Sequence, residues 1–173
     1  EKNLENPLID EIIVFKEGSC QNTIENGKIK YLENERMTFQ QMFDYCNSYL
    51  SGEICIVSNT DIYFDKTLER LNEIDLDNKL ITLTRWDILE NNRVRFYGLP
   101  FSQDSWIFKA PIKIKNANFY MGVPGCDNKM VYLGVENNLE VHNPSLDIIS
   151  YHLHLSKYRT YTGRDRVKPP YLT

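Results

Sequence analysis

The sequence has no apolar run long enough to cross a bilayer, and no signal-peptide pattern stands at its start. It also lacks internal repeats, low-complexity tracts and inter-domain linkers. Its 173 residues therefore predict a single domain over 1–173. Nothing in the pattern predicts a transmembrane segment as part of that domain.

Cysteine is scarce and scattered. Cys20, Cys46, Cys55 and Cys126 lie far apart, without a CxxC pair or a Cys/His cluster of zinc-finger spacing. This spacing argues against a small zinc-binding framework. We interpret the four as reduced thiols, and since such thiols are typical of the cytosol, we expect a cytoplasmic protein.

Positive charge is not in excess. The chain has 20 Lys and Arg against 24 Asp and Glu, a formal net charge of -4. This balance argues against nucleic acid or an anionic membrane surface as a partner. With 42% hydrophobic and 25% charged residues, the composition is that of a globular domain with a real core.

Hydrophobic periodicity predicts strands that alternate with helices early in the chain, followed by shorter strands. The expected strands are 12–15, 27–33, 53–58, 79–88, 93–98 and 104–110. The expected helices are 37–52, with Thr38 as N-cap, then 66–75 and 126–138. This order favours an α/β domain whose mostly parallel central sheet is flanked by helices, with a small antiparallel addition. The basic stretch 157–173 is expected to be a flexible tail.

The stretch IVSNTDIYFD interrupts a β-rich run with Asn59, Thr60 and Asp61. These residues follow a predicted central strand, and in parallel sheets ligands bind at the carboxyl ends of the strands. A carboxylate at that place is a hard oxygen ligand that suits Mg²⁺ or Mn²⁺. The alternative interpretation is a plain turn between two strands.

The stretch YHLHLS places His152 and His154 two residues apart in an extended segment. Their side chains are therefore expected on the same face of a strand. Histidine together with an aspartate is a suitable ligand set for Mn²⁺. Alternatively, both are half-buried histidines held by ordinary hydrogen bonds.

The stretch YMGVPGCDNKM is a Gly-rich loop that opens a helix, with Asp127 in the first turn. The helix dipole favours the ionised carboxylate there. Asp127 is therefore either a general base beside a substrate or a plain N-terminal cap.

Two aromatic stretches carry further candidates. In FSQDSWIF, Asp104 either binds a sugar hydroxyl or is a loop carboxylate, and Trp106 either stacks on a sugar or lies in the core. In LTRWD, Arg85 and Asp87 flank Trp86. They either line an acceptor pocket or form a surface ion pair around a core tryptophan.

Taken in chain order, these stretches resemble glycosyltransferases of the GT-A fold. SNTDIYFD looks like their DxD element, MGVPGCDNKM is similar to their acidic region before the catalytic helix, and YHLHLS looks like their late metal-binding histidine. The resemblance covers residues from about 8 to 160 and is strongest to small bacterial and large-DNA-virus domains, including the rhamnosyltransferase-type domain of chlorella viruses. It implies a GT-A-like, Rossmann-like fold and transfer of a sugar from a nucleotide-sugar, with a UDP-sugar favoured, to a glycan acceptor.

The resemblance also implies roles for single residues. Asp61, with His152 or His154, would hold Mn²⁺ or Mg²⁺ against the diphosphate of the donor. Asp127 would deprotonate the acceptor hydroxyl and so invert the anomeric centre, with Asp104 as the rival base.

The remaining implied contacts concern the two substrates. Donor-binding residues would be Asn59, Thr60, Asp61, Arg159 and Arg164. Residues for the acceptor or its sugar would be Trp86, Asp87 and Trp106.

The sequence departs from the family pattern in three places. Asn59 stands in the first acidic position of the DxD element, and Cys126 precedes Asp127 where a second carboxylate is usual. The strand that usually begins the nucleotide-binding half is not evident before Ile12, so we expect the domain to lack its first strand or to carry it upstream. Single carboxylates keep open a binding module without turnover. A metal-dependent phosphohydrolase also uses Asp and His with Mg²⁺ or Mn²⁺, but it is less favoured because it would want more carboxylates around Asp61 and a basic surface.

Overall fold

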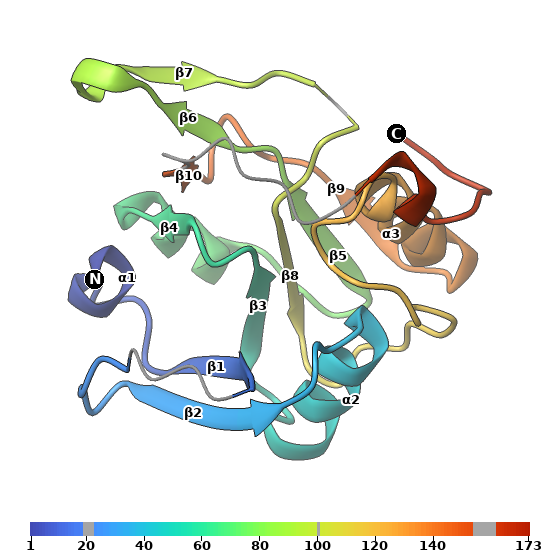
Figure 1. The fold of residues 1–173 in the computed structure, drawn as a ribbon, viewed down its shortest axis with the longest axis horizontal. Helices are drawn as coiled ribbons and strands as arrows, with labels where there is room; N and C mark the ends of the chain where they lie inside the picture. Colours follow the sequence, from blue (N-terminus) through green and yellow to red (C-terminus); the bar gives the residue numbers. More distant parts are fainter. Residues whose placement is uncertain (19–22, 100, 154–161) are drawn as a thin grey trace.

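The computed structural model describes residues 1–18, 23–99, 101–153 and 162–173. Across these residues the strands form one two-stranded and two four-stranded sheets (Figure 1). No helix within these ranges is long and apolar enough to cross a membrane.

The central sheet contributes much of the core. Its order is β3-β8-β5-β9, with strands at Ile54–Ser58, Ser105–Lys109, Lys79–Leu83 and Glu140–His142. Strand β8 runs antiparallel to both β3 and β5, whereas β9 is parallel to β5. All of β8 except its last residue is buried, as expected for a strand in the middle of a sheet.

A smaller sheet has the order β4-β10-β6-β7, with strands at Ile62–Phe64, Ser150–His152, Trp86–Ile88 and Val94–Phe96. Its register places four residues side by side in one row: Ile62, His152, Asp87 and Arg95. The adjacent row consists of Tyr63, Tyr151, Trp86 and Phe96. Because side chains alternate along a strand, the two rows lie on opposite faces of this sheet.

The two-stranded sheet pairs β1 (Ile12–Glu17) with β2 (Ile29–Asn34) in parallel. Phe15 of β1 packs edge-on against Tyr45, with ring centroids 5.4 Å apart. The short helix α1 (Lys2–Glu5) lies beside β4, where the Asn3 side chain hydrogen-bonds the β4 backbone.

Two longer helices, α2 (Phe39–Tyr49) and α3 (Cys126–Glu136), pack their apolar residues into the same core as the central sheet. Thr38 caps α2 in a capping box with Gln41, which confirms the predicted N-cap. The predicted start of α3 is likewise confirmed, with Asp127 in its first turn. Within the described ranges the chain also forms the 3-10 segments η1 (Lys66–Glu73), η2 (Glu90–Asn92) and η3 (Gly163–Asp165).

The predicted fold class is wrong. We expected one Rossmann-like, mostly parallel sheet flanked by helices, but the strands divide among three sheets that mix antiparallel and parallel pairs. The apolar run 79–88 is two strands, since β5 ends at Leu83 and β6 begins in another sheet at Trp86. Between β5 and β8 the chain forms the antiparallel pair β6–β7 instead of a crossover helix. Strand β8 therefore returns antiparallel to β5.

Candidate functional site

The predicted polar residues gather where the chain passes from the central sheet to the smaller sheet. Asn59 lies between β3 and β4, and Arg85 lies between β5 and β6. The backbone of Asp104 connects the β3–β4 segment with the β5–β6 segment. Its N–H donates to the Leu83 carbonyl over 3.0 Å, and its carbonyl accepts from the Asn59 N–H over 3.2 Å. The β3–β4 and β5–β6 segments are thereby held next to each other.

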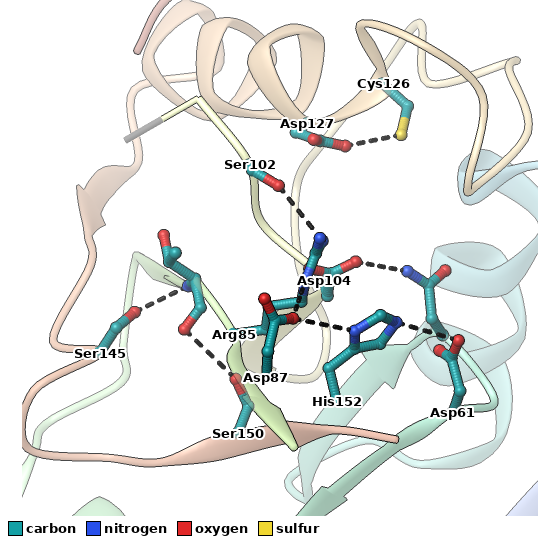
Figure 2. Close-up of polar contacts among 12 residues, drawn as sticks. Asp61, Arg85, Asp87, Ser102, Asp104, Cys126, Asp127, Ser145, Ser150 and His152 are labelled. Atoms are coloured by element: carbon teal, nitrogen blue, oxygen red, sulfur yellow. Dashed lines mark hydrogen bonds and ion pairs between the residues drawn. The ribbon is translucent and has the colours of Figure 1, made fainter. Parts of the chain in front are cut away.

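Asp104 is held at both oxygens. Its Oδ1 accepts from Asn59 Nδ2 over 2.8 Å, and its Oδ2 accepts from Arg85 Nη1 over 2.9 Å (Figure 2). The side chain is only 10% exposed. Both of its oxygens are therefore already engaged by an amide and a guanidinium.

Arg85 bridges two carboxylates. Besides Asp104 it contacts Asp87, whose Oδ1 accepts from Arg85 Nε over 2.9 Å. The guanidinium also lies 4.1 Å above the centre of the Tyr97 ring. Desolvation disfavours the charged guanidinium, but Asp104 and Asp87 outweigh it and raise the pKa of Arg85. The Arg85–Asp87 pair is thus a partly buried part of this network rather than an exposed surface ion pair.

His152 stands between two carboxylates contributed by distant parts of the chain. Its Nδ1 lies 3.2 Å from Asp87 Oδ1, and its Nε2 lies 3.1 Å from Asp61 Oδ2. The Leu153 N–H also donates to the Asp61 carbonyl over 2.8 Å, which fixes the β3–β4 turn against β10. Asp61 and His152 are therefore brought together although 91 residues separate them.

The charges of this group support one another. Desolvation favours neutral His152, but the hydrogen bond and charge of Asp61, with help from Asp87, raise the pKa of the imidazole. Desolvation likewise favours the neutral form of Asp87. Hydrogen bonds from Arg85 and His152 outweigh that effect and hold the pKa of Asp87 below its ordinary value.

Asp127 faces this network from the first turn of α3 (Figure 2). Part of its side chain reaches the surface, although protein atoms crowd the rest. Burial raises its pKa to about 6, and the nearby charge of Asp104 acts in the same direction. Hydrogen bonds from the Cys126 thiol and from the backbone of Gln103 oppose the rise. Asp127 is therefore a carboxylate that changes charge close to neutral pH.

A buried cluster behind Arg85 escaped the sequence analysis. Ser145 Oγ accepts from the Thr84 N–H over 2.7 Å, and Asn143 Nδ2 donates to Thr84 Oγ1 over 3.0 Å. Ser145 also accepts the Trp86 indole N–H at its carbonyl over 2.8 Å, and the Ser150 hydroxyl donates to the Thr84 carbonyl over 3.5 Å. The cluster fixes the peptide units on either side of Thr84, the residue before Arg85. The sequence signal was the turn-forming Asn143-Pro144-Ser145 stretch, which by itself indicates only a turn.

Other predicted residues do not join the network. Trp106 is fully buried and packs edge-on against Phe39 with centroids 4.7 Å apart, an arrangement that leaves no ring face for a sugar. Trp86 is half-buried against Phe96. Thr60 and Arg164 are exposed. His154 and Arg159 lie outside the described residues.

The C-terminal stretch is described from residue 162 onward, and this part packs beside α3. The Val167 N–H donates to the Pro124 carbonyl over 3.0 Å, and the Leu172 N–H donates to the Asn128 carbonyl over 3.1 Å. Both acceptors lie within a few residues of Asp127. The predicted tail therefore contacts the helix start that carries the candidate base.

The Asp61–His152 pair fits a divalent cation in part. A carboxylate and an imidazole are suitable donors for Mn²⁺, and Asp87 at Nδ1 is the kind of partner that orients a metal-binding histidine. Among the described residues, however, no group of three or more His, Cys, Asp or Glu is placed to hold a metal ion. The protein ligands evident among the described residues are thus two, which suits an ion that takes its other ligands from water or from a bound molecule.

Two surface hollows of the described chain lie away from the network. One of about 220 Å³ lies between α1 and β4 beside Asn6 and Asp65, and one of about 420 Å³ lies beside Gly52 and Lys109. Neither is lined by a residue of the network. The converging titratable groups of the network, rather than either hollow, mark the candidate site.

Comparison with known proteins does not identify the function of this site. No family model, no curated protein and no solved structure matches the chain. What the site does is therefore inferred from its own residues.

Proposed function

We propose that the protein is a glycosyltransferase that moves a sugar from a nucleotide-sugar to a hydroxyl group of a glycan. The observation that supports this proposal is that residues from distant parts of the chain come together in one site. Asn59, Asp61, Asp87, Asp104 and His152 were singled out in four separate stretches of the sequence, and they share one hydrogen-bonded network. Asp127, the predicted base, faces the same network. The proposal concerns the activity only, because the predicted fold class did not hold.

Asp127 is the better base of the two carboxylates. Asp104 already accepts from Asn59 and Arg85, so a proton transferred to it would have to displace one of these bonds. The pKa of Asp127 is raised to about 6, which makes it a stronger base than an ordinary aspartate while leaving it ionised at neutral pH. In the proposed step, the acceptor oxygen bonds to the anomeric carbon and passes its proton to Asp127. The bond from that carbon to the diphosphate breaks, and its electron pair leaves with the nucleotide. One such displacement inverts the anomeric centre.

Asp61 and His152 are the residues that would hold Mn²⁺ or Mg²⁺ beside the diphosphate. When bound, the cation would neutralise charge that develops on the leaving diphosphate. Asp87 orients His152 through Nδ1. Arg85 in turn fixes Asp87.

The substrates are assigned in outline. We propose that Asn59, Thr60 and Arg164 contact the donor, with a UDP-sugar as the favoured one. Trp86 and Asp87 remain candidates for the acceptor side, whereas Trp106 is no longer included because it is fully buried. We propose a cytoplasmic location, which suits the free thiols of Cys46, Cys55 and Cys126.

The test is calorimetric binding of UDP-, GDP-, dTDP- and CMP-sugars, with Mn²⁺ and with EDTA, combined with a chromatographic assay for released nucleotide. We expect one nucleotide family to bind in a Mn²⁺-dependent way. Asp61→Ala should lose that binding, and Asp127→Asn should bind the donor without releasing nucleotide. Asp77→Asn is the matched control, since Asp77 is an exposed carboxylate before β5, at the opposite end from Arg85.

The outcomes separate the competing functions. Binding by the wild type without any turnover, across a panel of glycan acceptors, would indicate a binding module. Failure of every donor to bind would refute the proposal. Release of phosphate from simple phosphate esters, without sugar transfer, would indicate a phosphohydrolase.

A further inference from the structure

We propose that Cys126 is a positioning residue whose thiol donates a hydrogen bond to Asp127 and so sets the basicity of that carboxylate. This inference rests on the proposed role of Asp127 as base. It concerns a residue to which the sequence alone assigned no role beyond that of a reduced thiol at a departure from the family pattern. The two residues are neighbours in the first turn of α3, yet their side chains meet instead of diverging.

The contact is direct and enclosed. Cys126 Sγ lies 2.8 Å from Asp127 Oδ1, and Cys126 is only 1% exposed (Figure 2). Water therefore has little access to the thiol. A thiol bears one proton, so when Asp127 is ionised the sulfur must be the donor and the carboxylate the acceptor.

The direction of the thiol proton is set from the other side. The backbone of Gly122 hydrogen-bonds to the Cys126 sulfur, so the sulfur accepts from the loop and its own proton is left for Asp127. Gly122 has a left-handed φ of 75°, a conformation that favours glycine, and this turns the loop back over the helix start. In the sequence Gly-x-x-x-Cys-Asp, the loop amide thereby donates a hydrogen bond to the thiol, and the thiol donates one to the carboxylate.

Burial keeps the thiol protonated, which is the form that can donate to Asp127. Desolvation raises the pKa of Cys126 far above that of an ordinary thiol, and the neighbouring charge of Asp127 raises it further. The thiol therefore stays protonated at every pH at which Asp127 titrates. A donor that never loses its proton stabilises only the ionised carboxylate, so its effect is to lower the pKa of Asp127.

Few other groups compete for Asp127. From the segment before β8 it is faced by the charge of Asp104 and by the backbone of Gln103. Arg85 lies behind Asp104 and is paired with it. From the C-terminal segment the side chain that reaches this loop is Tyr171, whose hydroxyl lies close to Gly125. Among these groups Cys126 is the side-chain donor to Asp127.

The test is the titration of the Asp127 carboxyl carbon by NMR in the wild type and in Cys126→Ala, with Asp127→Asn used to assign the signal. Loss of the donor should raise the midpoint by about 0.5 to 1 pH unit. Cys126→Ser retains a donor and should titrate at or below the wild-type midpoint. Cys46→Ala is the control, because Cys46 is also buried in this core but lies in α2.

This measurement does not depend on any activity, so its failure is distinct from failure of the proposed function. An unchanged midpoint in Cys126→Ala, or a Cys126→Ser midpoint that rises as in the alanine variant, would overturn the inference. If transfer is detected, the pH dependence of kcat should shift by the same amount in Cys126→Ala while its plateau at high pH stays within about twofold of wild type. A fall of the plateau without a shift would indicate a structural role only, and would also overturn it.

Discussion

Asp104 and Asp127 carry the same chemical group in two different surroundings. Asp104 accepts from a guanidinium and an amide, so its charge is matched by fixed donors. Asp127 accepts hydrogen bonds from a thiol and from the backbone, but burial and the charge of Asp104 outweigh them and raise its pKa. A pair of carboxylates whose surroundings differ in this way is typical of sites that move protons.

Replacing Asp127 with Asn should stabilise the protein at alkaline pH. The folded-state pKa of about 6 lies above the ordinary value of 3.8, so folding loses stability as pH rises through this window. Above pH 7 the ionised carboxylate costs at most about 3 kcal/mol, which the amide does not incur. Urea denaturation at pH 8 should show the gain for Asp127→Asn, and at pH 3.5 the difference from wild type should vanish.

The opposite sign would count against the raised pKa of Asp127. If Asp127→Asn were less stable than wild type at pH 8, the charged carboxylate would have to be favourably paired in the folded state. Asp77→Asn, which changes an exposed carboxylate, should show no gain at either pH.

Removing the Arg85 side chain should destabilise the protein strongly. Arg85→Leu leaves Asp104 and Asp87 close together without their shared cation, which we expect to cost roughly 2 to 4 kcal/mol at pH 7. Arg95→Leu is the control, because Arg95 also pairs with Asp87 but is 65% exposed, and it should cost below about 1 kcal/mol. Chemical denaturation of both variants checks this, and equal losses would contradict the bridging role of Arg85.

At the scale of the element, the sequence predicted individual strands and helix starts well. Thr38 was predicted as the N-cap of α2, and the β-branched apolar run marked strand β3. It did not predict the break between β5 and β6. Neither Thr84 nor Arg85 is a turn-forming residue, and the break depends on distant partners such as Ser145, which is 61 residues from Thr84. Periodicity reports which face of a segment is buried, not which sheet it joins.

The break after β5 gives a prediction of its own. Ser145→Ala removes the acceptor of the buried Thr84 N–H and should cost about 1 to 3 kcal/mol. The Thr84 amide should also exchange with solvent faster than in the wild type, relative to the amides of β8. Hydrogen exchange by NMR measures both amides in one experiment. Ser51→Ala, at an exposed turn, is the control and should change neither quantity.

At the scale of the whole molecule, the charges of the site predict a protein most stable in mild acid. His152 has a raised pKa, so the stability that it contributes is present below about pH 6.5 and is lost as pH rises through its folded pKa. Asp127 acts in the same sense. Asp87 has a lowered pKa, so its contribution is present above the ordinary value of 3.8 and is lost as pH falls further.

Thermal melts in EDTA from pH 3 to 9 should therefore have their maximum between about pH 4 and 6. In Asp127→Asn the decline on the alkaline side should be shallower, and the remaining slope should come from His152. A maximum at pH 8 for the wild type would contradict these pKa directions. EDTA is essential to this comparison, because a bound cation would compete with the proton on His152.

The resemblance implied that several of these residues share a site, whereas the buried serines that support the network were not foreseen. The motifs around Asp61, Asp104 and His152 carried a chemical expectation that the structure brings into one network. The Ser145 and Ser150 contacts could not be foreseen, because serines in short polar stretches have no pattern that separates a buried acceptor from an exposed one. Their role emerges only when the break between β5 and β6 is known.

The row that aligns Ile62, His152, Asp87 and Arg95 has a consequence for how the gene of such a protein can change in length. In β10 and β6, gain or loss of a single codon would reverse the faces, so that Tyr151 or Trp86 would stand where His152 or Asp87 now stands. Two-codon changes would preserve the alternation. The β6–β7 turn is exposed and outside this constraint, so length variants should accumulate there and be rare within the strands.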